Sequence, residues 1–183
     1  MADRIGMNGM HGVPQGARVI TRGVVFVHSS PRALCSHVEW AIADVIGAPV
    51  SIDWVAQPIL PGSVRGEVSW SGAPGTASRL VSLLHGWGRL RLEVTEEPTA
   101  TTEGERYCVS PSLGVFRAAV GAHGDIQVSE ERLRGAIARC ALSGASLEDE
   151  IVGLLGGSWD AELEPFRYAG EGAAVQWLHQ VVS

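Results

Sequence analysis

A histidine, two serines and an arginine stand together in the segment His28-Ser29-Ser30-Pro31-Arg32, where an apolar run ends and a helical pattern begins. The free N–H groups in the first turn of a helix, and the positive end of its dipole, bind anions. These side chains therefore predict a site for the carboxylate or phosphate of a small metabolite. The structural alternative is that the serines only cap the helix and the histidine makes a local hydrogen bond.

The other reactive side chains form no recognisable catalytic or metal-binding pattern. Cys35 and His37 lie two positions apart on the predicted helix, so their side chains point in different directions. The cysteines do not have zinc-site spacing, and no serine stands in a nucleophile elbow. All 14 Lys+Arg residues are arginine, so Schiff-base chemistry and P-loop nucleotide binding cannot use side chains of this chain. We assign no catalytic residue, no metal ligand and no cofactor.

The elements that must position these residues follow a β-α-β-β-α-β order. Alternating or continuous apolar runs predict strands, and apolar residues three or four apart predict helices. The predicted strands cover residues 17–28, 50–56, 64–71 and 90–96, and the predicted helices cover residues 31–46 and 74–86. This order predicts an α+β fold, a ferredoxin-like sandwich with sheet order 4-1-3-2 and both helices on one face.

A polar segment over residues 98–105 divides the chain into a first half, residues 17–97, and a C-terminal half, residues 105–183. The C-terminal half is expected to contain strands at 106–110, 115–120 and 126–128, and then three helical stretches. Ser129 and Ser146 are the predicted N-caps of the first two, and Ala174, Trp177, Leu178 and Val181 form the stripe of the third. We expect this hairpin and these helices to extend the sheet or cover its open face. Residues 1–16 are expected to be a flexible leader.

Charged side chains alternate along the open face of the predicted sheet. They are Arg65 and Glu67 on one strand and Arg91 and Glu93 on another, with Asp53 beside them. Mixed charges favour a contact with another protein or a second copy of the chain, rather than with lipid or nucleic acid. The alternative is a face that is solvated or covered by another part of the chain.

Composition excludes several classes of protein. The chain has 183 residues, 45% of them hydrophobic, and a net charge of −6. The negative charge argues against a general nucleic-acid binder, because cationic side chains supply most of the non-specific affinity. No apolar run approaches the ~20 residues of a membrane span. Three scattered cysteines fit free thiols in a reducing cytoplasm.

Four segments carry a resemblance that extends over the whole chain: GVVFVHSSPRALCSHVEWAI, VSIDWVAQP, GEVSWSG and LRLEVTEEP. They resemble an actinobacterial family of proteins of unknown function. The arginine-rich composition without lysine is typical of a GC-rich bacterial genome. The resemblance implies an accessory or regulatory role linked to type II fatty-acid synthesis, and it assigns no role to any residue.

Two functions from different classes follow from these observations. The first is a non-enzymatic cytoplasmic protein that binds a protein partner or a small anionic metabolite. The second is a small enzyme that uses His28, Ser30 and Arg32 at a site between the two halves. A deep pocket with convergent polar groups would favour the enzyme, and an exposed apolar patch would favour the binding protein.

Overall fold

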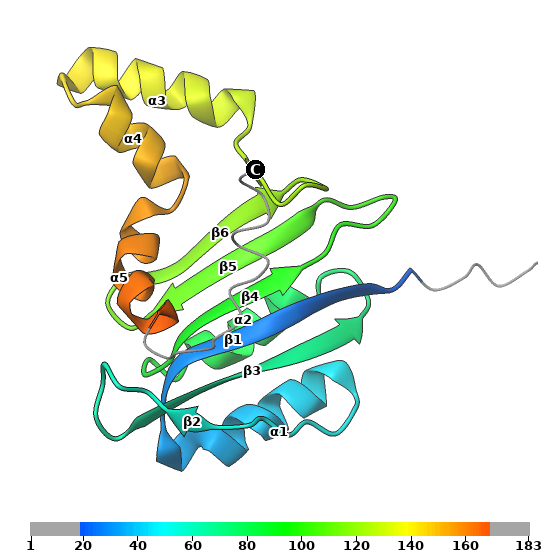
Figure 1. Cartoon of the computed structure of the whole chain (residues 1–183). Coiled ribbons are helices and arrows are strands. Elements are labelled where there is room, and N and C mark those ends of the chain that lie inside the picture. The colour runs from blue at the N-terminus through cyan, green and yellow to red at the C-terminus, as the bar shows by residue number, and fades with distance from the viewer. Residues whose placement is uncertain (1–18, 169–183) are drawn as a thin grey trace, which may run out of the picture.

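The computed structural model describes residues 19–168. It has a mixed α+β fold in which seven strands form one antiparallel sheet, in the order β2-β3-β1-β4-β5-β6-β7 (Figure 1). The strands are β1 (Thr21–Pro31), β2 (Val55–Ala56), β3 (Ser63–Gly72), β4 (Arg91–Glu96), β5 (Gly104–Ser110), β6 (Gly114–Val120) and β7 (Ile126–Gln127). The helices are α1 (Cys35–Ile46), α2 (Thr76–His85), α3 (Glu130–Ser143), α4 (Leu147–Leu154) and α5 (Gly157–Arg167).

The predicted order of the first four strands, 4-1-3-2, is confirmed. Strand β1 lies between β3 and β4, and β2 pairs with the outer edge of β3. The central position of β1 explains its continuous apolar run, because neighbouring strands and a helical layer surround it. The hairpin β5–β6 continues the sheet beyond β4.

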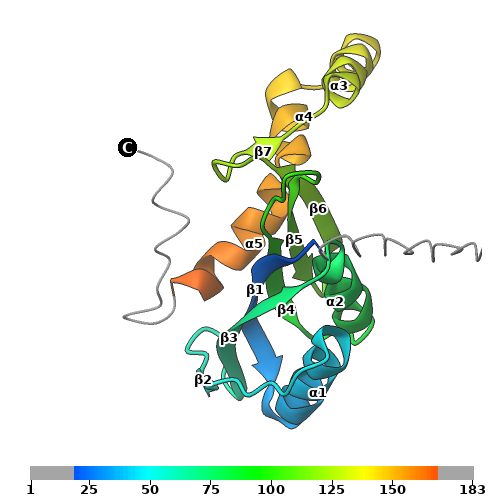
Figure 2. The ribbon, with the colours of Figure 1, turned by 90° about the vertical axis from the view of Figure 1, so that its right-hand side faces the viewer.

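Helices cover the two faces of the sheet differently (Figure 2). Helices α1 and α2 lie on one face, as predicted, and bury the main apolar core against β1 and β4. Val25 and Val27 of β1 and Leu80 and Leu84 of α2 are almost completely buried there. Helix α5 lies on the opposite face. The sheet is therefore covered on one side by the first half of the chain and on the other by its C-terminal half.

The predicted start of the first helix is wrong. Ser29, Ser30 and Pro31 belong to β1, a 3-10 turn over Arg32–Leu34 follows, and α1 begins at Cys35 without a side-chain cap. Strand β1 extends this far because a bulge after Val27 restores its pairing with β3. Backbone pairing with a neighbouring strand thus outweighs the local capping signal of the two serines.

The predicted second strand, residues 50–56, is mostly irregular. Only Val55–Ala56 pairs with β3. In the preceding segment, the backbone N–H of Ile52 and the indole N–H of Trp54 donate to a carboxylate oxygen of Glu39 on α1, at 2.9 and 3.1 Å. A side chain of the helix therefore accepts the bonds that a neighbouring strand would otherwise have accepted.

Helix α5 was not predicted from the sequence. Gly156 and Gly157 have the appearance of a break, and Pro165 lies inside the helix, which disfavours a helical prediction. The predicted caps of α3 and α4 are confirmed, because the hydroxyls of Ser129 and Ser146 accept bonds from backbone N–H groups three residues later. The predicted leader and the stripe that contains Trp177 lie outside the described residues.

The carboxylate of Glu96 caps helix α2 from the end of β4. Its two oxygens accept hydrogen bonds from the backbone N–H groups of Gly75 and Ala77 at 2.7 and 2.9 Å, and the side chain is buried. We expect Glu96→Ala to lower the free energy of unfolding by about 1.5–3 kcal/mol, since a buried charged acceptor is lost. Urea unfolding measures this change. The exposed neighbour Glu97 is the control, and Glu97→Ala should stay within about 0.5 kcal/mol; equal effects would contradict the capping role.

Candidate functional site

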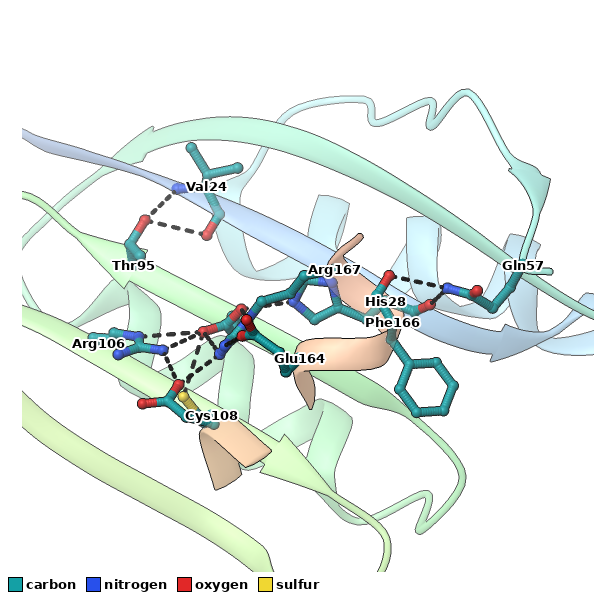
Figure 3. A network of polar contacts seen from close by, with 11 residues as sticks. Val24, His28, Gln57, Thr95, Arg106, Cys108, Glu164, Phe166 and Arg167 are labelled. Carbon is teal, nitrogen blue, oxygen red and sulfur yellow. Dashed lines mark hydrogen bonds and ion pairs between the residues drawn. The ribbon is translucent and has the colours of Figure 1, made fainter. Parts of the chain in front are cut away.

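A buried carboxylate, Glu93 of β4, lies on the sheet face that α5 covers. It stands opposite Phe26 of β1 and Cys108 of β5 in the strand register, so its side chain shares a face with His28 and Arg106, each two residues further along a neighbouring strand. Helix α5 adds a second arginine, Arg167. In Figure 3 the side chains of His28, Arg106 and Arg167 are directed to the same region between the sheet and α5.

Both oxygens of Glu93 are fully engaged. Arg167 binds it in a bidentate manner, with Nη2 2.8 Å from Oε1 and Nε 2.9 Å from Oε2. Arg106 Nη2 lies 2.7 Å from Oε1, and His28 Nε2 lies 2.7 Å from Oε2. Asp160 of α5 accepts a bond of 2.7 Å from each arginine. Two carboxylates thus balance two guanidinium groups, and we call these five residues the Glu93 cluster.

The Glu93 cluster ties α5 to three strands that lie far away in the sequence. Gln57, also buried, strengthens the same junction: its side-chain amide donates to the backbone carbonyls of His28 and Phe166 at 2.7 and 3.3 Å (Figure 3). Arg91 of β4 and Glu162 of α5 form a further ion pair, with Nε 3.1 Å from Oε1. Helix α5 is therefore held mainly by polar contacts, with Leu163 and Phe166 as its buried apolar side chains.

The contacts within the cluster favour the charged forms of Glu93 and Arg167. Burial alone would raise the pKa of the Glu93 carboxyl, but the hydrogen bond and charge of His28, with those of Arg167 and Arg106, hold it well below the ordinary value of 4.5. Burial likewise opposes the charged form of Arg167, yet the bonds to Glu93 and Asp160 raise the pKa of its guanidinium above the ordinary value. The geometry therefore favours a closed ion cluster at neutral pH.

Glu93, Cys108 and Asp160 also place possible metal-ligand atoms within 4.8 Å of one another. The same carboxylates bind Arg106 and Arg167, whose positive charges repel a cation. Burial and the nearby Glu93 carboxylate raise the pKa of the Cys108 thiol to about 12, so it stays protonated at neutral pH. This donor set fits salt bridges better than a metal ion.

A different surface stands away from the sheet. Helices α3 and α4, together called the arm, pack on each other at the end of the molecule beyond β6 and β7 (Figure 1). Their buried side chains are Ala136 and Leu154. Large apolar side chains along the arm are exposed by more than a third: Leu133, Ile137, Leu142, Leu147, Ile151, Val152 and Leu155. Exposed large apolar side chains are characteristic of interaction sites where they gather on one surface.

A family model described as "Protein of unknown function (DUF3145)" matches residues 24–180. The chain belongs to the DUF3145 family. The match includes the sheet, the Glu93 cluster and the arm, and it confirms the whole-chain resemblance to a family of unknown function. No curated protein and no solved structure matches the chain significantly. Among residues 19–168, no helix combines the length and apolar character that a membrane crossing requires.

The four residues of the predicted anion site have different surroundings in the structure of this DUF3145 chain. His28 points into the Glu93 cluster, and Arg32 is exposed in the following turn. Ser30 is buried and donates to the carbonyl of Pro31 at 3.1 Å. The hydroxyl of Ser29 is buried without a hydrogen-bond partner among the described residues. His28 and Ser30 therefore have hydrogen-bond partners within the chain, and Arg32 faces solvent.

The residues of the predicted partner surface are not all exposed. Glu93 is only 4% exposed, because α5 covers it, so this residue is corrected from a surface to a core position. Arg91 lies under α5 as well, with its guanidinium 4.7 Å from the centre of the Phe166 ring. Asp53 and Glu67 are exposed, and Arg65 is half-buried. Near α5, therefore, the charged face of the sheet is covered by another part of the chain. This outcome matches the alternative interpretation of that face.

Cys108 of this DUF3145 chain should be the least reactive of the three thiols. With a pKa of about 12 its thiolate population near pH 8 is roughly a thousandfold below that of a free cysteine. We expect iodoacetamide to label it at a correspondingly low rate in the native protein, as measured by peptide mass spectrometry. Half-buried Cys140 is the internal control. Equal labelling of the two thiols would show that α5 does not protect this part of the sheet.

Proposed function

We propose that the protein is a non-enzymatic accessory or regulatory protein that binds a protein partner through the α3–α4 arm. The observation that carries this proposal is the row of exposed apolar side chains along both helices. Leu133 and Ile137 are one turn apart on α3. Leu147 and Ile151 are one turn apart on α4, and Leu155 follows as the C-cap residue of that helix. Ala136 and Leu154 are the buried side chains of the two helices, and each is next in sequence to a member of its row.

The energetics of the arm support a partner. Helix α4 has eight residues and α3 has 14, lengths at which an isolated helix is marginal in water. Tertiary packing must therefore supply most of the stability of such helices. The arm buries few of its own side chains, whereas five apolar residues at helical spacing face outward. A surface that covers them would recover the hydrophobic free energy that the chain alone leaves unused.

The Glu93 cluster supports a binding protein over an enzyme. Glu93 and Asp160 are engaged by arginines, and the neighbouring thiol is protonated. A general base or a nucleophile would need a free lone pair beside a substrate. The cluster instead fixes α5, the helix that continues directly from the arm, so its role in this proposal is to anchor the arm to the sheet.

Other assignments stay proposals. We propose that residues 17–97 form a ferredoxin-like unit, which the strand order, the antiparallel pairing and the shared face of α1 and α2 support. Residues 105–183 would then be its C-terminal extension. A cytoplasmic location fits the free cysteines, and an actinobacterial source fits the arginine-only cationic composition. The link to fatty-acid synthesis and the binding of a small anion also stay predictions.

Site-specific photo-crosslinking in cells tests the proposed function. A photoreactive amino acid at Ile137 should give one discrete adduct, which mass spectrometry identifies, and which Ile151→Asp in the same chain should abolish. The matched control is the same probe at Leu142, nine residues after Leu133 on α3. At about 3.6 residues per turn its side chain lies on the opposite side of the helix, and it is 90% exposed. Absence of an adduct from Ile137, or equal adducts from both positions, would count against the arm as the binding surface.

A further inference from the structure

The arm carries the same short pattern on both of its helices, with one charge inverted. Helix α3 has Leu133-Arg134 and then Ile137, and α4 has Leu147-Glu148 and then Ile151. In each helix the charged residue is three positions before the isoleucine, so it flanks the apolar row on the corresponding side. The two rows are therefore matched in apolar shape and opposite in charge.

We infer that the partner bound by the arm is a second copy of this chain, in a two-fold symmetric dimer. This inference rests on the proposed function and names its partner. In an isologous dimer each surface patch meets the same patch of the other copy. If two arms lie antiparallel, the base of one against the tip of the other, α3 of one copy runs alongside α4 of its partner in the same direction.

This arrangement brings matching layers together. In the register that sets position 133 level with 147, three residues away from level helix starts, position 137 faces 151. Leucine then meets leucine and isoleucine meets isoleucine, and the next layer pairs alanine at 141 with leucine at 155. Arg134 then stands next to the acidic position 148 of the other copy. By symmetry the same layers form twice, so one sequence supplies both sides of the interface.

The unpaired charges of the arm agree with this register. Among the described residues Glu148 and Asp149 at the start of α4 take part in no ion pair, and Arg134 has only an exposed i,i+4 pair with Glu130. Charges at the rim of an interface contribute orientation and register more than affinity. The charge pattern therefore favours the antiparallel arrangement over a parallel one, which would place arginine beside arginine.

The area of the arm is also sufficient for two copies. Without Leu142, which lies on the opposite side of α3, six large apolar side chains of the arm are each more than a third exposed and leave several hundred Å² on one chain. An interface between two such arms, with the flanking charged side chains, approaches the ~1,200 Å² at which stable interfaces begin. The arm projects from the body (Figure 2), so the sheet does not block the approach of a second arm.

Sedimentation velocity on the full-length protein tests this inference. We expect a species of twice the 19.3 kDa chain mass at micromolar concentration. Ile137→Asp should weaken dimerisation by about 30-fold or more, because it puts a charge at the centre of the apolar layers. Leu142→Asp on the opposite side of the same helix should leave the dimer intact, and circular dichroism should show that both variants keep their helices.

A charge exchange tests the register. Arg134→Glu should weaken the dimer by roughly 3- to 10-fold, since two symmetric pairs become repulsive. The double variant with Arg134→Glu and Glu148→Arg should return to within about twofold of the original dissociation constant, because each pair is then rebuilt with its charges exchanged. Additive weakening in the double variant would overturn the antiparallel arrangement.

The outcomes separate this inference from the proposed function. A monomer at all concentrations up to about 100 µM overturns the dimer. If the Ile137 photoadduct then contains another protein, the arm is still a docking surface and the proposed function stands. If the adduct joins Ile137 to a peptide from residues 169–183 of the same chain, that segment covers the arm and both proposals fail.

Discussion

Glu93→Ala is expected to lower the free energy of unfolding by about 3–5 kcal/mol, because it leaves Arg106 and Arg167 buried without their shared carboxylate. Both guanidinium groups lie within 2.9 Å of a Glu93 oxygen, and their side chains are 12% and 7% exposed. Urea unfolding measures the change. Glu93→Gln is the matched control for the charge, since it keeps the shape of the side chain. A decrease of less than about 1 kcal/mol in the free energy of unfolding of the alanine variant would contradict a central role for the cluster.

The same carboxyl should make stability depend on pH. Its pKa is well below 4.5 in the folded protein, because the bonds and charges of His28, Arg167 and Arg106 outweigh burial. A group with a lowered folded pKa contributes stability that is complete above the unfolded value and is lost as pH falls below it. The stability difference between the original protein and Glu93→Gln should therefore shrink between about pH 5 and pH 3. A constant difference over this range would contradict the assignment.

Gly156→Ala should be the second strongly destabilising change. Gly156 is the N-cap residue of α5 and has φ of 84°, and a Cβ atom there would lie 2.5 Å from the Phe116 ring. Left-handed backbone strain of about 1–2 kcal/mol adds to an overpacking cost of about 1–3 kcal/mol, so we expect the free energy of unfolding to fall by about 2–5 kcal/mol. Thermal and urea unfolding measure it, and labelling of Cys108 should increase as α5 shifts.

Gly144 provides the matched control for this change. It ends α3 with φ of 72°, and a Cβ atom there would meet nothing within 4 Å. Gly144→Ala should therefore show the backbone strain alone, about 1–2 kcal/mol, without any effect on Cys108. Equal effects at the two glycines would mean that α5 does not pack tightly on Phe116.

Much of the sheet could be predicted because its signals are local. Alternation in the third and fourth strands and the apolar run of β1 follow directly from the two-residue period of a strand. The first helix was predicted too early because serine and proline at positions 29–31 have the composition of a cap. What decided the structure there was pairing with β3, a contact between segments more than 30 residues apart, which a local pattern cannot show.

The Glu93 cluster could be predicted only in part. The sequence patterns place His28 and Glu93 in two different candidate sites, since nothing in their own segments shows that they meet at 2.7 Å. Arg106 stands two residues before Cys108 on a predicted strand, and this alternation was a usable signal for a shared face. Asp160 and Arg167 depend on α5, and the glycines and proline of that segment conceal its helical character.

The long sequence separations within the Glu93 cluster have a consequence for the order of folding. The bonds from Arg167 to Glu93 span 74 residues, and the bond from Gln57 to Phe166 spans 109. Loops of this length close after local hairpins and helices have formed, because their closure entropy must be overcome first. The docking of α5 is therefore expected to follow the main folding barrier. Substitutions in the cluster should accelerate unfolding and leave the refolding rate nearly unchanged, so the cluster acts mainly on the lifetime of the native state.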